Sequence, residues 1–181
     1  KYKNNLLSNR RRGLDLKKIL RIDYNDFMNN ITLIAVGALK NKALQSLAAD
    51  YQKRIKPYAR LQKLETPASP FRKDDRNKAK KREKEALEKV LHRYPKESIF
   101  ILAETGRLFD SVAFSNFLSE YDGRDLVFLI GGALGWEEEL ALKYPALSLS
   151  PLTFPHELAR VVLLEQIYRG LLLKAGKEYH Y

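Results

Sequence analysis

LVFLIGGALGWEEELALKYPALSLSPLTFPHELARVVLLEQIYRG, residues 126–170, contains the most informative structural signals of this 181-residue chain. It joins an apolar run typical of a buried strand, a glycine turn, a second short apolar run, a loop of serine, proline and threonine, and a nearly all-apolar helix. In open α/β sheets, ligands bind in the loops that follow the carboxyl ends of strands. We therefore expect this part of the chain to hold the active site.

From Ile31 onward, the chain alternates between strand-like and helix-like segments with short links. The continuous apolar run at Ile31–Val36 predicts a strand buried on both faces. Further strands are expected at 60–66, 98–102, 125–130 and 146–149, and helices at 44–55, 72–92, 111–121, 136–143 and 155–173. The strand at 60–66 is more polar and is expected nearer an edge. This alternation predicts an α/β fold with a mostly parallel sheet covered by helices.

Residues 1–30 differ from the rest of the chain and are expected to form a basic N-terminal extension, followed by the main domain at 31–181. Asparagine and basic residues dominate this extension, and its apolar residues recur only loosely. Arg10, Arg11 and Arg12 are consistent with contact to phosphate or with an organelle-targeting leader. Both interpretations stay open from the sequence.

The sequence contains no cysteine and three histidines, which argues against disulfides, thiolate metal sites and a structural zinc ion. Its longest apolar runs are far shorter than the ~20 residues that a membrane-spanning helix needs. We therefore expect a soluble, cytoplasmic protein that uses no metal and contacts no membrane. If the N-terminal extension is a leader, the protein is instead organellar.

Positive charge is concentrated in the first half of the chain. Residues 1–96 carry 26 Lys and Arg against 10 Asp and Glu, whereas residues 97–181 carry 7 against 12. A basic surface joined to a less charged half suggests a polyanionic substrate, most plausibly nucleic acid. The alternative is that the densest basic segment, residues 73–96, is only the solvated face of a helix.

The glycine turn GGALG, residues 131–135, is the first of three candidate sites. Glycine at a strand end permits close approach of the backbone to a ligand. The turn does not have the spacing of the dinucleotide-binding fingerprint, and no phosphate-binding P-loop occurs in the chain. Taken alone, it is more simply explained as a tight connection between a strand and a helix.

The loop at residues 148–155, SLSPLTFP, is the second candidate. Its prolines and small hydroxyls favour a fixed loop whose main-chain groups are not all used in regular structure, which leaves them free to bind a flat, uncharged heterocycle such as adenine. Leu152 and Phe154 are placed to flank that heterocycle. The alternative is a rigid helix start with Pro155 at the first helical position.

His156 and Arg160 form the third candidate, because their i, i+4 spacing places them on one face of the last helix. Arg160 is the only charge between Glu157 and Glu165, and a cation in so apolar a setting must be paired. Its partner is expected to be a core carboxylate, a bound phosphate or a reacting base. A lone histidine at a helix start is more often structural than catalytic.

Several motifs together resemble one known family. They are LIGG-x-x-G, S-L-S-x-L-T-F-P-H, R-V-V-L-x-E-Q-I-Y-R, the opening I-T-L-I-A-V-G and the terminal Y-H. In this order they closely resemble the RlmH (YbeA) family of SPOUT-class methyltransferases of bacterial large-subunit ribosomal RNA. The resemblance runs from about Ile31 to His180, so that only the extension lies outside it.

The resemblance implies an activity and a fold. Members of the family transfer a methyl group from S-adenosylmethionine to ring nitrogen 3 of a pseudouridine in ribosomal RNA. Their C-terminal third is threaded into a trefoil knot, a feature so rare that no sequence pattern alone predicts it. They act as homodimers in which the C-terminal tail contributes to the site. We therefore expect this chain to bind S-adenosylmethionine and ribosomal RNA and to form a homodimer.

The resemblance also implies which residues act. The residues expected to bind the cofactor are Leu102, Gly132, Ser150, Pro151, Leu152, Thr153, Phe154 and Pro155. Arg160 is expected to stabilise the developing anion of the base, His156 or His180 to accept its proton, and Tyr179 to position it. The family has a basic residue after the terminal Y-H where this chain has Tyr181, and this departure weakens the expectation of a phosphate contact from the tail.

Two other functions remain open from the sequence. One is a non-catalytic RNA-binding factor of ribosome assembly that has kept the fold. The other is a SPOUT methyltransferase that acts on transfer RNA.

Overall fold

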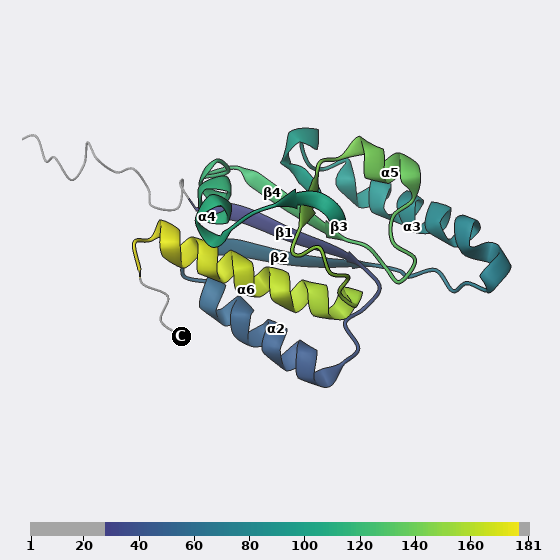
Figure 1. Ribbon diagram of the computed structural model, residues 1–181, viewed down its shortest axis with the longest axis horizontal. Helices are drawn as coiled ribbons and strands as arrows, with labels where there is room; N and C mark the ends of the chain where they lie inside the picture. Colours follow the sequence, from purple (N-terminus) through teal and green to yellow (C-terminus); the bar gives the residue numbers. More distant parts are fainter. Residues whose placement is uncertain (1–27, 178–181) are drawn as a thin grey trace, which may run out of the picture.

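Five parallel strands form one sheet, in the order β2-β1-β4-β3-β5, in the computed structural model, which describes residues 28–177 (Figure 1). The strands are β1 (Asn29–Val36), β2 (Ala59–Thr66), β3 (Ile99–Leu108), β4 (Asp125–Ile130) and β5 (Ala146–Ser148). The α/β class and the parallel sheet are thus confirmed. β2 lies at one edge, as the polar pattern of residues 60–66 predicts.

The two strands at the middle of the sheet are the most apolar ones. β1 pairs with β4 from Asn30↔Asp125 to Ala35↔Ile130, and β1 pairs with β2 on its other side. Side chains from Leu126 to Ile130 are at most 2% exposed. Continuous apolar runs become central strands because their alternate side chains are buried by helices on opposite faces of the sheet.

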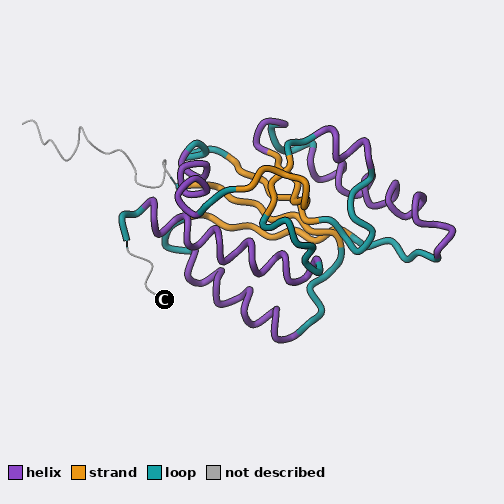
Figure 2. Tube along the Cα trace, in the orientation of Figure 1, coloured by secondary structure: helices purple, strands orange, loops and turns teal. Residues whose placement is uncertain are grey.

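The helices cover the sheet from both sides. α2 (Lys42–Ile55), α4 (Ser111–Ser119) and α6 (His156–Lys174) pack on one face, whereas α3 (Arg76–Leu91) and α5 (Glu138–Lys143) pack on the other (Figure 1). Figure 2 shows the strands, in orange, between these two groups of helices. Two separate apolar clusters result, one under each group.

Several helix ends follow local signals in the sequence. Asp110 caps α4, because its carboxylate accepts a hydrogen bond from the Ala113 N–H at 2.7 Å. α6 begins at His156, directly after Pro155. α3 begins at Arg76 rather than Arg72, because residues Lys73–Asp75 form a 3-10 turn first. α5 begins at Glu138 rather than Trp136, and Glu137 caps it.

The largest difference from the sequence-based expectation is in β3. A strand ending at Leu102 and a loop at residues 103–107 are predicted, but β3 continues to Leu108. Leu102 and Arg107 both pair with Leu147, so residues 103–106 bulge out of the sheet and pass beside β5. A Cβ at Gly106 would lie 2.5 Å from the Leu147 carbonyl carbon, so this crossing is closely packed. The trefoil knot stays a prediction.

Candidate functional site

The segments singled out in the sequence meet at the carboxyl ends of the strands. The strands are parallel, and therefore the glycine turn after β4, the bulge in β3 and the loop after β5 all lie at the same end of the sheet. Ligands of open α/β sheets bind at this end.

A cavity of about 820 Å³ lies where these segments meet, and we call it the glycine-turn cavity. The segment after Ile101, the glycine turn and the start of α6 each form part of its wall. Its lining residues are Leu102, Ala103, Glu104, Thr105, Ile130, Gly131, Gly132, Ala133, Leu134, Gly135, Trp136, Thr153, Phe154, Pro155, His156 and Ala159. The structure thus brings the glycine turn and the loop after β5 together at one cavity.

The glycine turn is shaped by its backbone. The Gly135 N–H donates a hydrogen bond to the Gly132 carbonyl at 3.1 Å. Gly135 has a φ of 69°, a backbone conformation that residues other than glycine rarely adopt. A Cβ at Gly132 would lie 3.0 Å from Cγ1 of Val36 and 3.4 Å from Oε2 of Glu83. The sheet and α3 therefore hold this backbone from behind.

Trp136 links the glycine turn to β3. Its indole N–H donates a hydrogen bond to the Leu102 carbonyl at 2.7 Å, and its ring would lie 3.3 Å from a Cβ at Gly131. Lys80 of α3 in turn donates to the Trp136 carbonyl at 3.0 Å. Trp136 and Glu104 line the cavity, although no sequence pattern singled them out. The one signal available for Trp136 is that the chain's single tryptophan directly follows the glycine turn.

The loop after β5 uses some of its polar groups internally. The Ser148 hydroxyl donates to the Ser150 carbonyl at 2.9 Å, and the Ser150 hydroxyl accepts from the Leu152 N–H at 3.0 Å. Of the predicted cofactor residues, Leu102, Gly132, Thr153, Phe154 and Pro155 line the glycine-turn cavity. Ser150 and Leu152 line an adjoining pocket of about 100 Å³ that shares Leu102 and Phe154 with it. Pro151 lines neither of the two.

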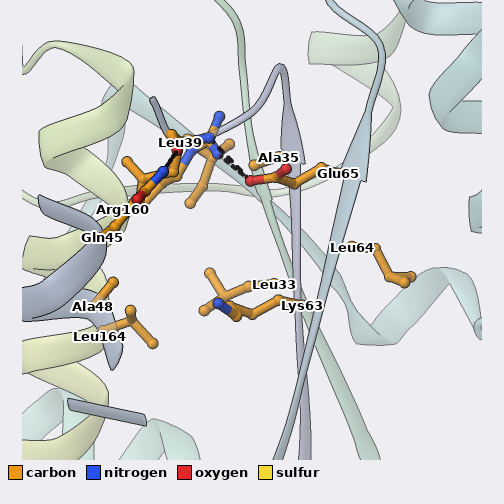
Figure 3. A pocket seen from close by; sticks show the side chains of 11 residues that line it. Leu33, Ala35, Leu39, Gln45, Ala48, Lys63, Leu64, Glu65, Arg160 and Leu164 are labelled. Atoms are coloured by element: carbon orange, nitrogen blue, oxygen red, sulfur yellow. Dashed lines mark hydrogen bonds and ion pairs between the residues drawn. The ribbon is translucent and has the colours of Figure 1, made fainter. Parts of the chain in front are cut away.

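His156 and Arg160 are not brought together. His156 lines the glycine-turn cavity, whereas Arg160 lines a separate pocket of about 270 Å³ between α2 and the sheet, which we call the Arg160 pocket (Figure 3). The Arg160 guanidinium pairs with the Glu65 carboxylate at 3.1 Å and donates to the carbonyls of Val36 at 2.9 Å and Gly37 at 2.8 Å. Of the three partners expected from the sequence, this structure shows a carboxylate.

The burial of Arg160 has an electrostatic consequence. The side chain is only 7% exposed, and this desolvation lowers the pKa of the guanidinium, which the Glu65 charge opposes. Arginine nevertheless stays protonated in proteins. Its Nε is buried without a hydrogen-bond partner in the described part of the chain, so the three contacts of the two Nη atoms hold the group in place.

Glu157 fixes the link between β1 and α2. Its carboxylate accepts hydrogen bonds from the N–H groups of Asn41 at 2.9 Å and Lys40 at 3.1 Å. These bonds, led by the one from Asn41, lower the pKa of Glu157. Glu65 accepts from the Leu39 N–H at 3.1 Å. Two carboxylates and one guanidinium therefore anchor this link.

The other predicted catalytic residues, Tyr179 and His180, lie outside the described residues. Between residues 28 and 177, no three or more His, Asp or Glu side chains are grouped as a metal ion would require. Over the same residues, no helix combines the length and the apolar character needed to cross a membrane.

Comparisons with known proteins show the family to which the chain belongs. Residues 29–180 match the family model described as "Predicted SPOUT methyltransferase". A protein of Methanococcus maripaludis, named by provisional assignment a ribosomal RNA large subunit methyltransferase H, is 40% identical over 161 residues, which cover 83% of this chain and 99% of that protein. The family match covers far more than half of the chain, and therefore this protein belongs to the SPOUT methyltransferase family.

Proposed function

We propose that this chain transfers a methyl group from S-adenosylmethionine to ring nitrogen 3 of a pseudouridine in large-subunit ribosomal RNA. The observation that carries the proposal is the convergence of the glycine turn, the bulge of β3 and the loop after β5 on one cavity. Support for the substrate comes from the name of the Methanococcus maripaludis relative and from the excess of positive charge in residues 1–96.

The cavity fits S-adenosylmethionine in size and chemistry. Its volume of about 820 Å³ is within the usual range of about 300–1,000 Å³ for small-molecule sites. We propose that the main chain of residues 131–135 and 153–155 holds the adenine and that Glu104 accepts hydrogen bonds from the ribose hydroxyls. When bound, S-adenosylmethionine supplies a methyl group already activated on a positively charged sulfur.

The protein's own contribution is then to position the base and to accept one proton. Holding two reactants in line contributes of the order of 7–11 kcal/mol in ideal cases. His156 lies in the cavity wall and is our proposed proton acceptor. His180 of the tail is the alternative acceptor, and we propose that Tyr179 positions the base.

For Arg160 we propose a positioning role in place of direct contact with the reacting base. Its two Nη atoms already contact Glu65 and two main-chain carbonyls, and it lines the Arg160 pocket rather than the glycine-turn cavity. These contacts join the end of β1 to the first turns of α6, the helix that presents His156. Arg160 therefore supports one wall of the cavity from behind.

One labelling experiment tests the proposal against its alternatives. The purified chain is incubated with methyl-tritiated S-adenosylmethionine and with intact ribosomes, separated subunits or transfer RNA. We expect label in large-subunit RNA, at a pseudouridine identified by nuclease digestion and mass spectrometry. Label in transfer RNA would favour the other SPOUT activity. Ribosome binding without label, and without heat from the cofactor in calorimetry, would favour a non-catalytic assembly factor.

The homodimer is a separate part of the proposal. Sedimentation of the purified chain at micromolar concentration is expected to give twice the mass of 21.0 kDa. A monomer that transfers methyl groups at the full rate would remove the partner copy from the site.

A further inference from the structure

The first turns of α3 extend beyond the sheet at the end where the strands terminate (Figure 1). The glycine-turn cavity lies at this same end. These turns follow the link from β2, which begins at this end of the sheet because β2 is parallel to β1. Residues 71–82 carry seven Lys and Arg against two Asp. The question is whether these charges are used inside the protein or are available to a partner.

One face of α3 is committed to the fold. Ala79, Glu83, Leu87 and Leu91 are buried at a spacing of four residues. Glu83 accepts a hydrogen bond from the Ser69 N–H at 2.9 Å and lies behind Gly132. Lys84 pairs with Glu139 and Glu137 of the segment around the start of α5. This face therefore attaches α3 to the glycine turn.

The remaining cations on this part of the chain are available. Arg72, Arg76, Lys81 and Arg82 are exposed, and none of them forms an ion pair with any residue from 28 to 177. Lys78 differs from them because it contacts Asp75 at 3.5 Å. A group of unpaired cations beside a cavity attracts a polyanion.

An exposed aromatic residue lies next to these cations. Phe71 is 42% exposed, belongs to neither apolar cluster and has no aromatic partner in the described chain. It precedes Arg72 in the link from β2 to α3. An exposed ring beside unpaired arginines is the combination with which proteins bind single-stranded RNA, since the ring stacks on a base while the cations contact phosphates.

We infer that Phe71, Arg72, Arg76, Lys81 and Arg82, which we call the α3 surface, bind a single-stranded segment of RNA and direct it to the glycine-turn cavity. This inference rests on the proposed function for the identity of the RNA as substrate. Direct RNA binding through the α3 surface is nevertheless measurable without methyl transfer. RNA explains the exposed aromatic ring as well as the charge, whereas an acidic protein explains only the charge.

The test measures binding of a fluorescein-labelled, uridine-rich, single-stranded RNA of 20 nucleotides by anisotropy, without cofactor and over a series of salt concentrations. The triple variant Arg76→Ala, Lys81→Ala, Arg82→Ala is expected to reduce the slope of log affinity against log salt by about 2, because each lost phosphate contact removes about 0.7. Phe71→Ala is expected to weaken binding by about tenfold, and Phe71→Trp to keep it.

The matched control removes three cations from the last turn of α3 and from the link that follows it. Lys89, Arg93 and Lys96 are exposed and lie near the start of β3, away from the cavity. Their triple alanine variant has the same net charge as the test variant, and we expect it to bind RNA almost as the natural chain does. Thermal unfolding by circular dichroism establishes that both triple variants fold.

Four results would overturn the inference: an unchanged slope in the test variant, an equal loss in both triple variants, tighter binding to phosphatidylserine vesicles than to RNA, or equal binding to polyglutamate. The proposed function fails differently. Normal RNA binding through the α3 surface without transfer of tritiated methyl to any RNA would refute the activity and leave the surface. If a test variant transferred methyl groups as fast as the natural chain, RNA binding through the α3 surface would be refuted and the proposed methyltransferase activity would stand.

Discussion

The glycine-turn cavity and the Arg160 pocket share Ile130 as a lining residue but differ in how their polar groups are used. In the Arg160 pocket, of about 270 Å³, Arg160 contacts Glu65 and two carbonyls, and the Gln45 amide donates to the Leu39 carbonyl at 2.5 Å (Figure 3). The glycine-turn cavity, of about 820 Å³, is lined largely by glycine, small and apolar residues.

The difference indicates how function and stability are divided in this protein. A pocket whose arginine is paired with a carboxylate and two main-chain carbonyls holds neighbouring elements together, because a ligand of Arg160 would have to break those contacts. A larger cavity lined by glycines and by the loop after β5 leaves room for a ligand and for main-chain hydrogen bonds to it. The following predictions test this division.

The largest effect is expected from Gly106→Ala, which disturbs the crossing that builds the cavity wall. The new Cβ would lie 2.5–2.7 Å from main-chain atoms of Ala146 and Leu147, which cannot move independently of the sheet. We expect a loss of about 3 kcal/mol or more in the free energy of unfolding, measured by urea denaturation.

The control for this variant is Gly135→Ala. A Cβ at Gly135 meets nothing within 4 Å, so only the strain of its φ of 69° remains, of the order of 1–2 kcal/mol. If Gly106→Ala were as stable as the natural chain, the close packing of residues 103–106 on β5 would be incorrect.

The second effect is expected from Arg160→Met, which removes the central group of the Arg160 pocket. Two main-chain carbonyls and a carboxylate lose their donor, and we expect a loss of the order of 3 kcal/mol in stability. Affinity for S-adenosylmethionine, measured by calorimetry at a temperature where the variant is folded, should change by less than about threefold because the cavity residues are intact.

Glu65→Gln is the matched variant for this pair. Its side chain is 46% exposed and can still accept a hydrogen bond, so its effect on stability should be smaller than that of Arg160→Met. A variant of Arg160 that is fully stable and binds the cofactor but transfers no methyl would instead place Arg160 at the reacting base.

A smaller effect is expected from Trp136→Phe, which removes the indole hydrogen bond to Leu102 but keeps an aromatic ring. One hydrogen bond contributes about 1 kcal/mol, so the affinity for S-adenosylmethionine should fall by about fivefold as the turn loosens. Tyr144→Phe in the buried cluster under α3 serves as the control.

The same residue also reports binding directly. Trp136 is the only tryptophan in the sequence and lines the glycine-turn cavity, so the intrinsic fluorescence of the natural chain should change on addition of S-adenosylmethionine. An unchanged spectrum at saturating cofactor would place the cofactor elsewhere.

The smallest effect is a pH dependence caused by Glu157. Hydrogen bonds from Asn41 and Lys40 lower the pKa of this carboxyl in the folded protein below the usual value of about 4.3. Ionised Glu157 therefore stabilises the fold above about pH 4.3, and the contribution disappears as the pH falls through the lowered pKa.

Accordingly, Glu157→Gln should lower the melting temperature at pH 7 and approach the natural chain as the pH is reduced below 4. Glu138→Gln, which changes an exposed glutamate in the first turn of α5, is the control for loss of charge near a helix start. A melting difference for Glu157→Gln that is constant from pH 7 to pH 3 would contradict the assigned hydrogen bonds.

Much of the fold follows from patterns along the chain. β4 matches its expected range, Asp125–Ile130, and α6 begins directly after Pro155. The extension of β3 beyond Leu102 was not predictable in the same way, since the polar sequence AETGR has the composition of a loop. It is extended because residues 107 and 108 pair again with β5, a contact between distant segments.

The site shows the same limit. Glycines and prolines mark the turns of the cavity, because each restricts or frees the backbone locally. Trp136 has no pattern that would have placed it beside Leu102, and the spacing of His156 and Arg160 predicts a shared face without showing that they line different pockets. The α3 surface is visible as charge in the sequence, but not which of its cations are paired.

Local patterns along the chain specify the α/β class, the succession of strands and helices, the glycine turn and the loop after β5, because apolar periodicity, glycine and proline act over a few residues. Three other features arise from the packing of the folded chain: Arg160 pairs with Glu65 and two carbonyls, Trp136 joins the glycine turn to β3, and the cations of the α3 surface form no ion pair within the described residues. These choices depend on contacts between residues far apart in the chain, and a buried charge or N–H group takes whichever partner the packed sheet and helices bring within reach.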